Sequence, residues 1–386
     1  FRNVTGVQTC ALPICLKYYI IAGEASGDLH GSNLMKEIQR NDSSFDFRFW
    51  GGDKMQDVGG KLVKHYRDLA FMGFSEVIAN LGTIMSNLKF CKEDLLQFNP
   101  DVLILIDYPG FNLRVAEFAH KKGIRVVYYI SPQVWAWKKN RVHKIRKVVD
   151  KMIVILPFEK DFYANYDYEV DFVGHPLLDS FHQLEENAKE NFRERNQLTP
   201  KPIIAVLPGS RKQEVKKMLT KMLSLVGDYP DHQFIVAGVN TLEKSFYHAI
   251  IGNTDVRLLF GETQNILINA DGALVTSGTA TLEAALIGVP EVVCYQGSKI
   301  SYEIAKRIVK VKYISLVNLI MDKEVVKELI QADLTHENLK HELDLILFDK
   351  VHRANMLGEY EELRGVLGNS GASMRAAKII DNILLQ

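Results

Sequence analysis

Short apolar runs alternate along the chain with longer segments that have helical spacing. The runs are rich in β-branched and aromatic residues and end at Gly, Pro, Ser or Asp, which is typical of buried strands in a parallel sheet. The pattern therefore predicts an α/β fold. The predicted strands are 18–22, 102–106, 126–130, 152–156, 203–207, 234–237, 272–275 and 292–295.

A polar, charged stretch at 176–202 separates two series of such strands, and 386 residues exceed what one core usually organises. We therefore expect two doubly wound, Rossmann-like domains that face a cleft. The predicted parts are a tail at 1–16, extraneous or disordered, a first domain at 17–180, a linker at 181–202, a second domain at 203–351 and C-terminal helices at 352–386 that could return to the first domain.

Ligands of open parallel sheets bind beyond the carboxyl ends of the strands, so the loops there are candidates for a site. In the first half, one such loop carries Glu24 and Ser26 in a small-residue turn before a helix. Asp107 ends a buried strand, where partial desolvation would suit a general base. The alternatives are a tight strand-to-helix turn for the first loop and a helix cap for Asp107.

Two loops of the second half have the character of anion-binding helix starts. A glycine turn followed by an arginine suits a diphosphate, because the turn offers amide donors and arginine a forked pair of N–H groups. Small and hydroxyl residues at a second helix start favour phosphate as well, and Glu283 could accept hydrogen bonds from a ribose. Together with Asp107, these loops predict a nucleotide-sugar transferase. Their residues are Gly209, Ser210, Arg211, Ser277, Gly278 and Thr279.

Composition narrows the class of protein. The 47 basic and 47 acidic residues cancel, which argues against a nucleic-acid partner. The 4 cysteines have neither metal-ligand nor disulfide-rich spacing, and they favour a reducing cytoplasmic compartment. No apolar run approaches the about 18 to 20 residues that span a bilayer. Because Asp53 and Asp68 stand apart and no metal or P-loop motif occurs, we expect no catalytic metal and no cofactor.

An apolar stripe with three- and four-residue spacing runs through a predicted helix at 71–89. Such a stripe usually packs in a core. It could instead line an acyl-chain groove or meet a membrane, with the basic run at 138–147 touching anionic lipid. The residues predicted for this membrane or acyl-chain surface are Phe74, Val77, Ile78, Leu81, Ile84 and Met85.

Longer motifs make a family resemblance specific. In order along the chain they are AGEASGDLHG (22–31), PDVLILIDYPGFN (100–112), SPQVWAWKKNRVHKI (131–145), LPFEKDFY (156–163), VGHPLLD (173–179), LPGSRKQEV (207–215), SGTATLEAAL (277–286) and SLVNLIM (315–321). From about residue 17 to the C-terminus, the chain resembles the lipid-A-disaccharide synthases.

The resemblance implies a GT-B fold, with the acceptor in the N-terminal domain and the nucleotide in the C-terminal one. It implies an inverting transfer from UDP-2,3-diacylglucosamine to 2,3-diacylglucosamine 1-phosphate (lipid X), at the cytoplasmic face of an anionic inner membrane. Asp107 matches the base and Arg211 the partner of the UDP phosphates, while Glu24, Ser26, Glu283 and Asn318 match further functional positions. At Gly110 many family members carry a second acidic residue, which puts more weight on Asp107.

Other functions with the same fold stay open at this point. A UDP-sugar epimerase of GT-B fold needs a UDP site but no lipid acceptor, and a transferase with an undecaprenyl-linked acceptor needs a different groove. A nucleotide-binding module without activity would have no need for the Asp107 loop. The sequence also leaves the oligomeric state open, a homodimer included.

Overall fold

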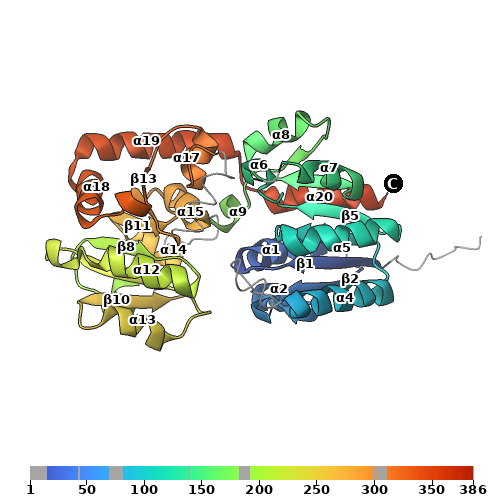
Figure 1. The fold of residues 1–386 in the computed structure, drawn as a ribbon, viewed down its shortest axis with the longest axis horizontal. Coiled ribbons are helices and arrows are strands. Elements are labelled where there is room, and N and C mark those ends of the chain that lie inside the picture. The colour runs from blue at the N-terminus through green and yellow to red at the C-terminus, as the bar shows by residue number, and fades with distance from the viewer. Residues whose placement is uncertain are drawn as a thin grey trace, which may run out of the picture.

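Two parallel sheets lie in two lobes side by side in the computed structural model (Figure 1). The structure describes residues 15–41, 44–68, 81–137, 139–181, 192–298, 302 and 311–385. Helices lie on both faces of each sheet, as the buried side chains of alternate strand positions require. The predicted α/β class is therefore confirmed.

The first sheet has seven strands, and the first strand in the sequence lies inside it, with neighbours on both sides. In spatial order the strands are β3 (Lys61–His65), β2 (Phe45–Gly51), β1 (Leu16–Ala22), β4 (Val102–Ile106), β5 (Arg125–Tyr129), β6 (Lys151–Val154) and β7 (Asp171–Phe172). The helices described with it are α1 (Ala25–Asn41), α2 (Asp53–Val58), α4 (Leu81–Phe98), α5 (Pro109–Lys121), α6 (Val134–Trp137), α7 (Arg141–Val148), α8 (Pro157–Ala164) and α9 (Leu177–Phe181), with a 3-10 turn, η1, at Tyr66–Asp68.

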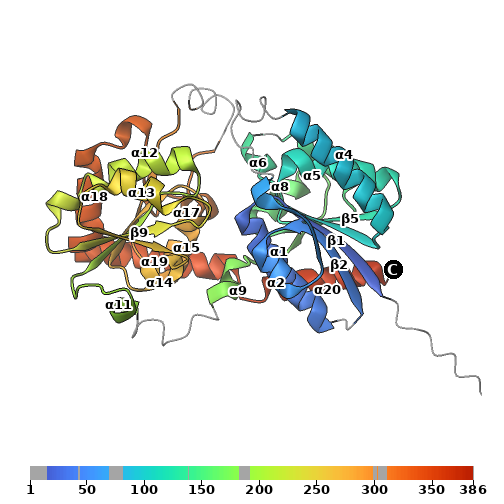
Figure 2. The ribbon, with the colours of Figure 1, turned by 90° about the horizontal axis from the view of Figure 1, so that it is seen from below.

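Successive side chains of the interior strand β1 point to opposite faces of the sheet, and the side chains on both faces are buried from Tyr18 to Ala22. Tyr18 and Ile20 belong to a core that contains side chains of α1 and of the last helix of the chain, α20 (Ala372–Leu384). Tyr19 and Ile21 belong to a second core with α4, α5 and α7. Figure 2 shows α4 and α5 on one side of this sheet and α1, α2 and α20 on the other.

The second sheet repeats the plan with six parallel strands. In spatial order they are β10 (Val256–Phe260), β9 (Gln233–Gly238), β8 (Ile203–Leu207), β11 (Gly272–Thr276), β12 (Glu291–Tyr295) and β13 (Lys327–Ile330). The helices described between Phe192 and Leu367 are α11 (Phe192–Arg195), α12 (Lys212–Leu223), α13 (Lys244–Ile251), α14 (Thr263–Ile268), α15 (Thr279–Ile287), α17 (Leu316–Met321), α18 (His336–Phe348) and α19 (Lys350–Leu367), with 3-10 turns η2 (Val226–Asp228) and η3 (Gln331–Asp333).

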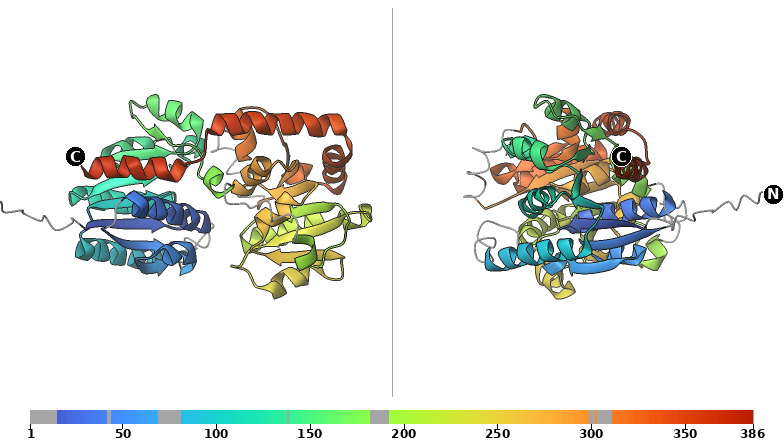
Figure 3. Two further views of the ribbon diagram at one scale, coloured as in Figure 1. Left: turned by 180° about the vertical axis from the view of Figure 1, so that it is seen from behind. Right: turned by 90° about the vertical axis from the view of Figure 1, so that its right-hand side faces the viewer.

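The chain ends on the first lobe, where α20 packs against α1 (Figure 3). The carboxylate of Asp179 accepts hydrogen bonds from the backbone N–H groups of Gly371 at 2.6 Å and Ser373 at 2.9 Å, at the start of α20. The Arg375 guanidinium donates to the carbonyl of Val173 at 2.8 Å. These contacts attach α20 to the segment that leaves the first sheet, whereas α19 packs on the second half.

The sequence pattern located the buried strands but missed several others. The predicted runs 102–106 and 203–207 coincide with β4 and β8, whose five residues are all buried. Strands β3, β10 and β13 were missed because they are exposed or half-buried for much of their length, so their patterns are partly polar. Strand β2 was missed although it lies inside the sheet, since Asp46 and Arg48 interrupt its apolar run.

The predicted C-terminal limit of the helix with the apolar stripe is wrong, because α4 continues past residue 89 to Phe98. Phe74, Val77 and Ile78, and the side chain of Leu81, lie outside the described residues. Of the remaining stripe, Ile84 is half-buried against the core and Leu88 is buried, while Met85 is 59% exposed. The stripe is thus partly core. The predicted linker at 181–202 and the other domain limits stay predictions.

Glu291, the first residue of β12, places a carboxyl group in the core of the second half. It is fully buried, and neither carboxylate oxygen has a hydrogen-bond partner among the described residues. Burial raises its pKa well above the usual value, because a core of low dielectric disfavours the charged form. The folded chain keeps Glu291 protonated at a pH where the unfolded chain has lost that proton.

We expect Glu291→Gln to stabilise the fold by an amount that grows with pH. A folded pKa above the unfolded one means that stability is present below the unfolded pKa and is lost as pH rises towards the folded pKa. Glutamine has no proton to lose, so its advantage should grow by about 1.4 kcal/mol per pH unit above about pH 5. Urea unfolding between about pH 5 and about pH 8 measures this, and a difference that does not change with pH would contradict it.

Candidate active site between the two sheets

The strand order brings the first two candidate loops together. Strand β1 pairs with β2 on one side and with β4 on the other, and the helices that follow β1 and β4 pack on opposite faces. Loops diverge at such a point and leave a crevice at the carboxyl ends of the strands. The loop with Glu24 and Ser26 follows β1, and the loop with Asp107 follows β4. The second sheet has the same arrangement, with β8 between β9 and β11.

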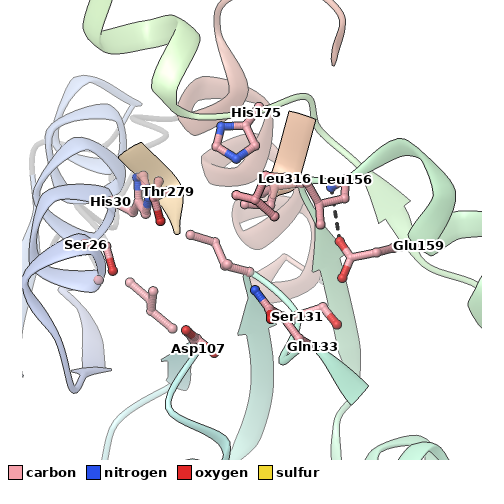
Figure 4. A pocket seen from close by; sticks show the side chains of 14 residues that line it. Ser26, His30, Asp107, Ser131, Gln133, Leu156, Glu159, His175, Thr279 and Leu316 are labelled. Carbon is pink, nitrogen blue, oxygen red and sulfur yellow. Dashed lines mark hydrogen bonds between the residues drawn. The ribbon is translucent and has the colours of Figure 1, made fainter. Parts of the chain in front are cut away.

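A pocket lies where the two halves meet (Figure 4). Residues of the first half make most of its wall, and Thr279 and Leu316 of the second half complete it. Its lining residues are Ser26, Gly27, His30, Ile106, Asp107, Ile130, Ser131, Gln133, Ile155, Leu156, Glu159, His175, Thr279 and Leu316. Of the predicted site residues, the structure therefore brings Ser26, Asp107 and Thr279 into one pocket.

Asp107 has a strained backbone that the surrounding core holds in place. Asp107 and Tyr108 both have positive φ, 44° and 49°, which costs about 1 to 3 kcal/mol for each such residue. The carbonyl of Asp107 accepts hydrogen bonds from the Tyr128 hydroxyl at 2.5 Å and from the Asn112 amide at 2.8 Å. These bonds orient the loop so that Asp107 lines the pocket.

The carboxyl group of Asp107 has the proton affinity that a general base needs. Burial and, to a smaller extent, the charge of Glu24 raise its pKa to about 7, although the backbone N–H of Tyr108 opposes the shift. A base works best when its pKa lies near the working pH. The helix-cap alternative is not supported, because the N-cap of α5 is Tyr108 and no side chain caps that helix.

Gly110, where the sequence departs from the family pattern, lies exposed in the first turn of α5. A Cβ atom built there meets no atom of the described residues within 4 Å. The structure therefore leaves space at this position for the acidic side chain that other family members carry.

Glu24 lies half-buried at the end of β1. Burial raises its pKa, and the charge of Arg211 from the second half opposes that rise. The neighbouring Gly23 packs under the Tyr108 ring, where a Cβ atom would come within 2.3 Å of a ring carbon, so this turn requires glycine. Glu24 therefore interacts electrostatically with both the candidate base and the candidate phosphate-binding arginine.

Asp28, the last acidic residue of the first loop, has a structural role. Its carboxylate accepts hydrogen bonds from the backbone N–H groups of Gly52 at 2.7 Å, Lys54 at 3.1 Å and Met55 at 3.1 Å. It is 3% exposed and caps α2, because helix N-termini present unpaired amide donors. Its carboxylate is thus engaged by backbone amides, and we assign Asp28 no part in the chemistry.

The glycine turn after β8 leads into α12 as predicted. Gly209 has φ +99°, and a Cβ atom there would lie 2.3 Å from a Glu214 carboxylate oxygen, so no other residue fits well. Ser210 and Arg211 are exposed, and Arg211 is the N-cap of α12. The Ser210 N–H group donates to the Glu214 carboxylate at 3.3 Å, so an incoming phosphate would compete with Glu214.

The loop after β11 positions its hydroxyl groups through the backbone. The Ser277 hydroxyl donates to the carbonyl of Ile314 at 2.9 Å, and the exposed Thr279 begins α15 and lines the pocket. Gly278 is the N-cap of α15. Glu283 is half-buried, and burial raises its pKa while the Gln264 side chain opposes the rise.

Asn318 is one predicted substrate ligand that the structure does not bring into the pocket. It is fully buried, and its amide bonds to Val325, Val326 and Glu328 within the chain. Glu328 also accepts from the N–H and the hydroxyl of Ser315. Asn318 and Glu328 thus hold the segment that carries Leu316, and the predicted contact of Asn318 with substrate stays a prediction.

Sequence reasoning missed three buried titratable residues of the pocket, although each stands in a quoted motif. Burial raises the pKa of Glu159 to about 7, and its carboxylate accepts from the N–H of Leu156 at 3.1 Å. Burial lowers the pKa of His30 to about 4 and that of His175 to about 3. The local sequence around these residues does not indicate that they are buried, because their burial depends on contacts made when the chain packs.

The described part of the chain has neither a metal-ligand cluster nor a membrane-spanning helix. No cluster of three or more His, Cys, Asp or Glu side chains there is arranged to hold a metal ion. No helix there has both the length and the apolar character needed to cross a bilayer. Of the cysteines it contains, Cys15 is exposed, while Cys91 and Cys294 are buried, and all are free thiols.

Known proteins similar in structure show the fold. The UDP-GlcNAc 2-epimerase of Neisseria meningitidis bound to UDP-GlcNAc has a TM-score of 0.65 at 14% identity, over 96% of this chain and 100% of that one. The glycosyltransferase of kitacinnamycin has a TM-score of 0.63 at 14% identity, over 96% and 99%. At this identity the likeness concerns the GT-B architecture alone.

Similarity in sequence is closer and covers nearly the whole chain. The chain is 40% identical to the lipid-A-disaccharide synthase of Syntrophus aciditrophicus over 365 residues, which is 93% of this chain and 95% of that protein. It is 38% identical to the synthase of Geobacter metallireducens over 374 residues, 95% and 96% of the two chains. Residues 18–379 match the family described as lipid-A-disaccharide synthetase. The chain therefore belongs to the lipid-A-disaccharide synthetase family of glycosyltransferases.

Proposed function

We propose that the chain joins UDP-2,3-diacylglucosamine to lipid X, giving the β-1,6-linked disaccharide 1-phosphate and UDP. Membership of the family supports this reaction. The observation that carries it is the carboxyl group of Asp107, whose pKa burial raises to about 7, in a pocket that Thr279 of the second half completes. Such a pocket can hold a hydroxyl group beside a base and under a phosphate-type loop.

In the proposed step, Asp107 takes the proton of the acceptor 6-hydroxyl while that oxygen forms a bond to the donor anomeric carbon. The bond from this carbon to the UDP oxygen breaks, and UDP leaves with the electron pair. Arg211 and the amides of the two helix starts stabilise the departing diphosphate, since charge-assisted donors act most strongly away from water. Glu24 keeps the proton affinity of Asp107 high.

The remaining predicted residues take supporting roles in this proposal. Ser26, which is exposed and lines the pocket, contacts a substrate hydroxyl beside Asp107. The donor nucleotide lies on the loops after β8 and β11, with the ribose at Glu283. The residues proposed for the diphosphate are Gly209, Ser210, Arg211, Ser277, Gly278 and Thr279.

A product assay tests the function directly. The purified chain, UDP-2,3-diacylglucosamine and lipid X should give the disaccharide 1-phosphate by mass spectrometry, and chelator treatment should leave the rate unchanged. Conversion of the UDP-sugar into an epimeric UDP-sugar without any acceptor would favour an epimerase, the class of one structural neighbour. Product formed only with an undecaprenyl-linked sugar would contradict the proposed acceptor.

We further propose that the chain binds the cytoplasmic face of the inner membrane peripherally. Met85, Phe90 and Leu96 of α4 are 59%, 46% and 45% exposed. The cationic helix α7 packs on the same face of the first sheet as α4, with α5 between them. Apolar side chains and nearby cations on one face suit an anionic lipid surface. Lys138 of the predicted basic run lies outside the described residues.

The homodimer that the sequence analysis left open stays a prediction.

We expect salt to release part of the protein from anionic vesicles, because the Debye screening length falls from about 10 Å at 0.1 M salt to about 3 Å at 1 M salt. Met85→Ser with Phe90→Ser should lower binding further, because exposed apolar area is lost. Ile84, half-buried against the core, is unsuitable for this test. Vesicle flotation measures binding, with Val351→Ser, 70% exposed on the other lobe, as the control. Wild-type protein that never floats at low salt would contradict the membrane proposal.

A further inference from the structure

Two histidines form part of the pocket wall and have no role in the proposed proton transfer. His30 lies on α1 one turn after Ser26 and is 5% exposed, and His175, in the turn after β7, is 2% exposed. Both line the pocket, and Figure 4 shows both imidazole rings at its wall. They come from segments far apart in the sequence, so the fold alone brings them together.

Both imidazoles are neutral at neutral pH. Burial lowers the pKa of His30 to about 4, and the carboxylate of Asp179 only partly opposes this. Burial and the neighbouring His30 lower the pKa of His175 to about 3. A neutral imidazole has one N–H donor and one acceptor nitrogen. It can therefore pair with a hydroxyl group, which both donates and accepts, in either tautomer.

The two rings differ in their hydrogen bonds. The Nδ1 atom of His175 accepts a hydrogen bond from the backbone N–H of Leu177 at 3.3 Å. The Nδ1 atom of His30 is buried and finds no hydrogen-bond partner in the described part of the chain. A buried polar atom without a partner destabilises a fold, so each such atom in a native structure calls for an explanation. His30 Nδ1 is thus an unpaired polar atom on a residue that lines the pocket.

We propose that His30 determines sugar specificity by hydrogen-bonding a free hydroxyl of the donor glucosaminyl group, with His175 as the neutral wall beside it. This rests on the proposed function, in which positions 2 and 3 of the donor are acylated and positions 4 and 6 carry free hydroxyls. The donor is favoured over the acceptor because Thr279, from the loop proposed to hold UDP, lines the same pocket as His30.

The test pairs enzyme variants with donor analogues that lack the 4- or the 6-hydroxyl. Wild-type enzyme should use one of these deoxy donors with a kcat/KM roughly threefold to tenfold below that of the intact donor. His30→Asn keeps polar atoms at the distance of Nδ1 from Cβ and should retain this ratio. His30→Leu and His30→Gln, which leave the Nδ1 position apolar, should bring the ratio close to one.

Tyr129→Phe is the matched control, because it removes a buried hydroxyl from the same core outside the pocket lining. It should change the melting temperature without changing the ratio. Circular dichroism identifies a variant that fails to fold, and His30→Gln serves if His30→Leu does so. Calorimetric Kd values for the donors without acceptor give the same ratios in the absence of turnover.

A ratio that survives in both His30→Leu and His30→Gln would overturn the inference, as would a wild-type enzyme that does not distinguish the deoxy donors. Sensitivity to a 4-deoxy acceptor instead would overturn the assignment to the donor. Failure of the proposed function looks different. In that case intact substrates give no disaccharide, while calorimetry still reports whether His30 reads a donor hydroxyl.

Discussion

Asp107→Asn is expected to lower the rate of disaccharide formation by about 10² to 10⁴, because the amide cannot take the proton of the acceptor 6-hydroxyl. The fold should survive the change. The loop is held through the carbonyl of Asp107, which Tyr128 and Asn112 bind, and an asparagine leaves that carbonyl in place. UDP binding should stay near wild type, since the proposed diphosphate contacts belong to the second half.

The pH profile gives an independent reading of the same residue. Because burial raises the pKa of Asp107 to about 7, the base is protonated and inactive below that pH and becomes available above it. The kcat/KM of the wild type should therefore rise about tenfold per pH unit below about pH 7 and level off above it. The folded pKa is raised, so ionised Asp107 destabilises the fold as pH rises, and Asp107→Asn should melt higher than wild type at about pH 8.

Asp349→Asn provides the matched control for a carboxylate that does cap a helix. Its side chain accepts from the backbone N–H groups of Val351 at 2.9 Å and His352 at 3.0 Å at the start of α19. Asparagine keeps an acceptor oxygen at the N-cap, so this change should cost only about 0.3 to 1 kcal/mol of stability, from the lost negative charge at the helix N-terminus, and leave turnover of the folded fraction unchanged. Single-turnover rates and melting temperatures separate the two cases. If Asp107→Asn behaves like Asp349→Asn, Asp107 is structural and Glu24 becomes the candidate base.

Arg211→Ala is expected to weaken use of the UDP-sugar by roughly 10- to 150-fold in kcat/KM, which corresponds to the about 1.5 to 3 kcal/mol of one charge-assisted hydrogen bond. Arg211 is exposed at the start of α12, beside amides that would face the same diphosphate. Its charge also acts on Glu24, so the variant should raise the pKa of Glu24 further. Donor binding and the environment of the base thus depend on one side chain.

Calorimetry with UDP alone isolates the phosphate contact, since no acceptor or base takes part. Arg211→Lys keeps the charge without the forked donors and should fall between wild type and alanine. Arg257→Ala, an exposed arginine on the edge strand β10, is the control for loss of a positive charge in the same half. An Arg211→Ala enzyme with unchanged UDP affinity and kinetics would remove Arg211 from the site.

The sequence alone determined the α/β class, the buried strands and the positions of the loops for which we propose a catalytic or binding role. Strands β4 and β8 could be located to the residue because each consists of five buried apolar residues, with an aspartate on either side of β4 and a proline on either side of β8. Parallel strands covered on both faces need such runs. Edge strand β13 has no such run, since it pairs with one neighbouring strand only and two of its four residues are charged. Local pattern therefore predicts a strand only where burial is complete.

Only the tertiary structure decided which loops meet and which side chains keep polar atoms free for a ligand. The carboxylate of Asp28 accepts hydrogen bonds from backbone amides 24 to 27 residues away. The side-chain amide of Asn318 donates a hydrogen bond to Glu328 of strand β13. Asp107, by contrast, keeps its carboxyl group for the pocket, and burial moves its pKa to about 7. Burial and hydrogen-bond partners arise from segments far apart in the sequence, so a motif can name a side chain without showing whether the folded chain uses it or leaves it for a substrate.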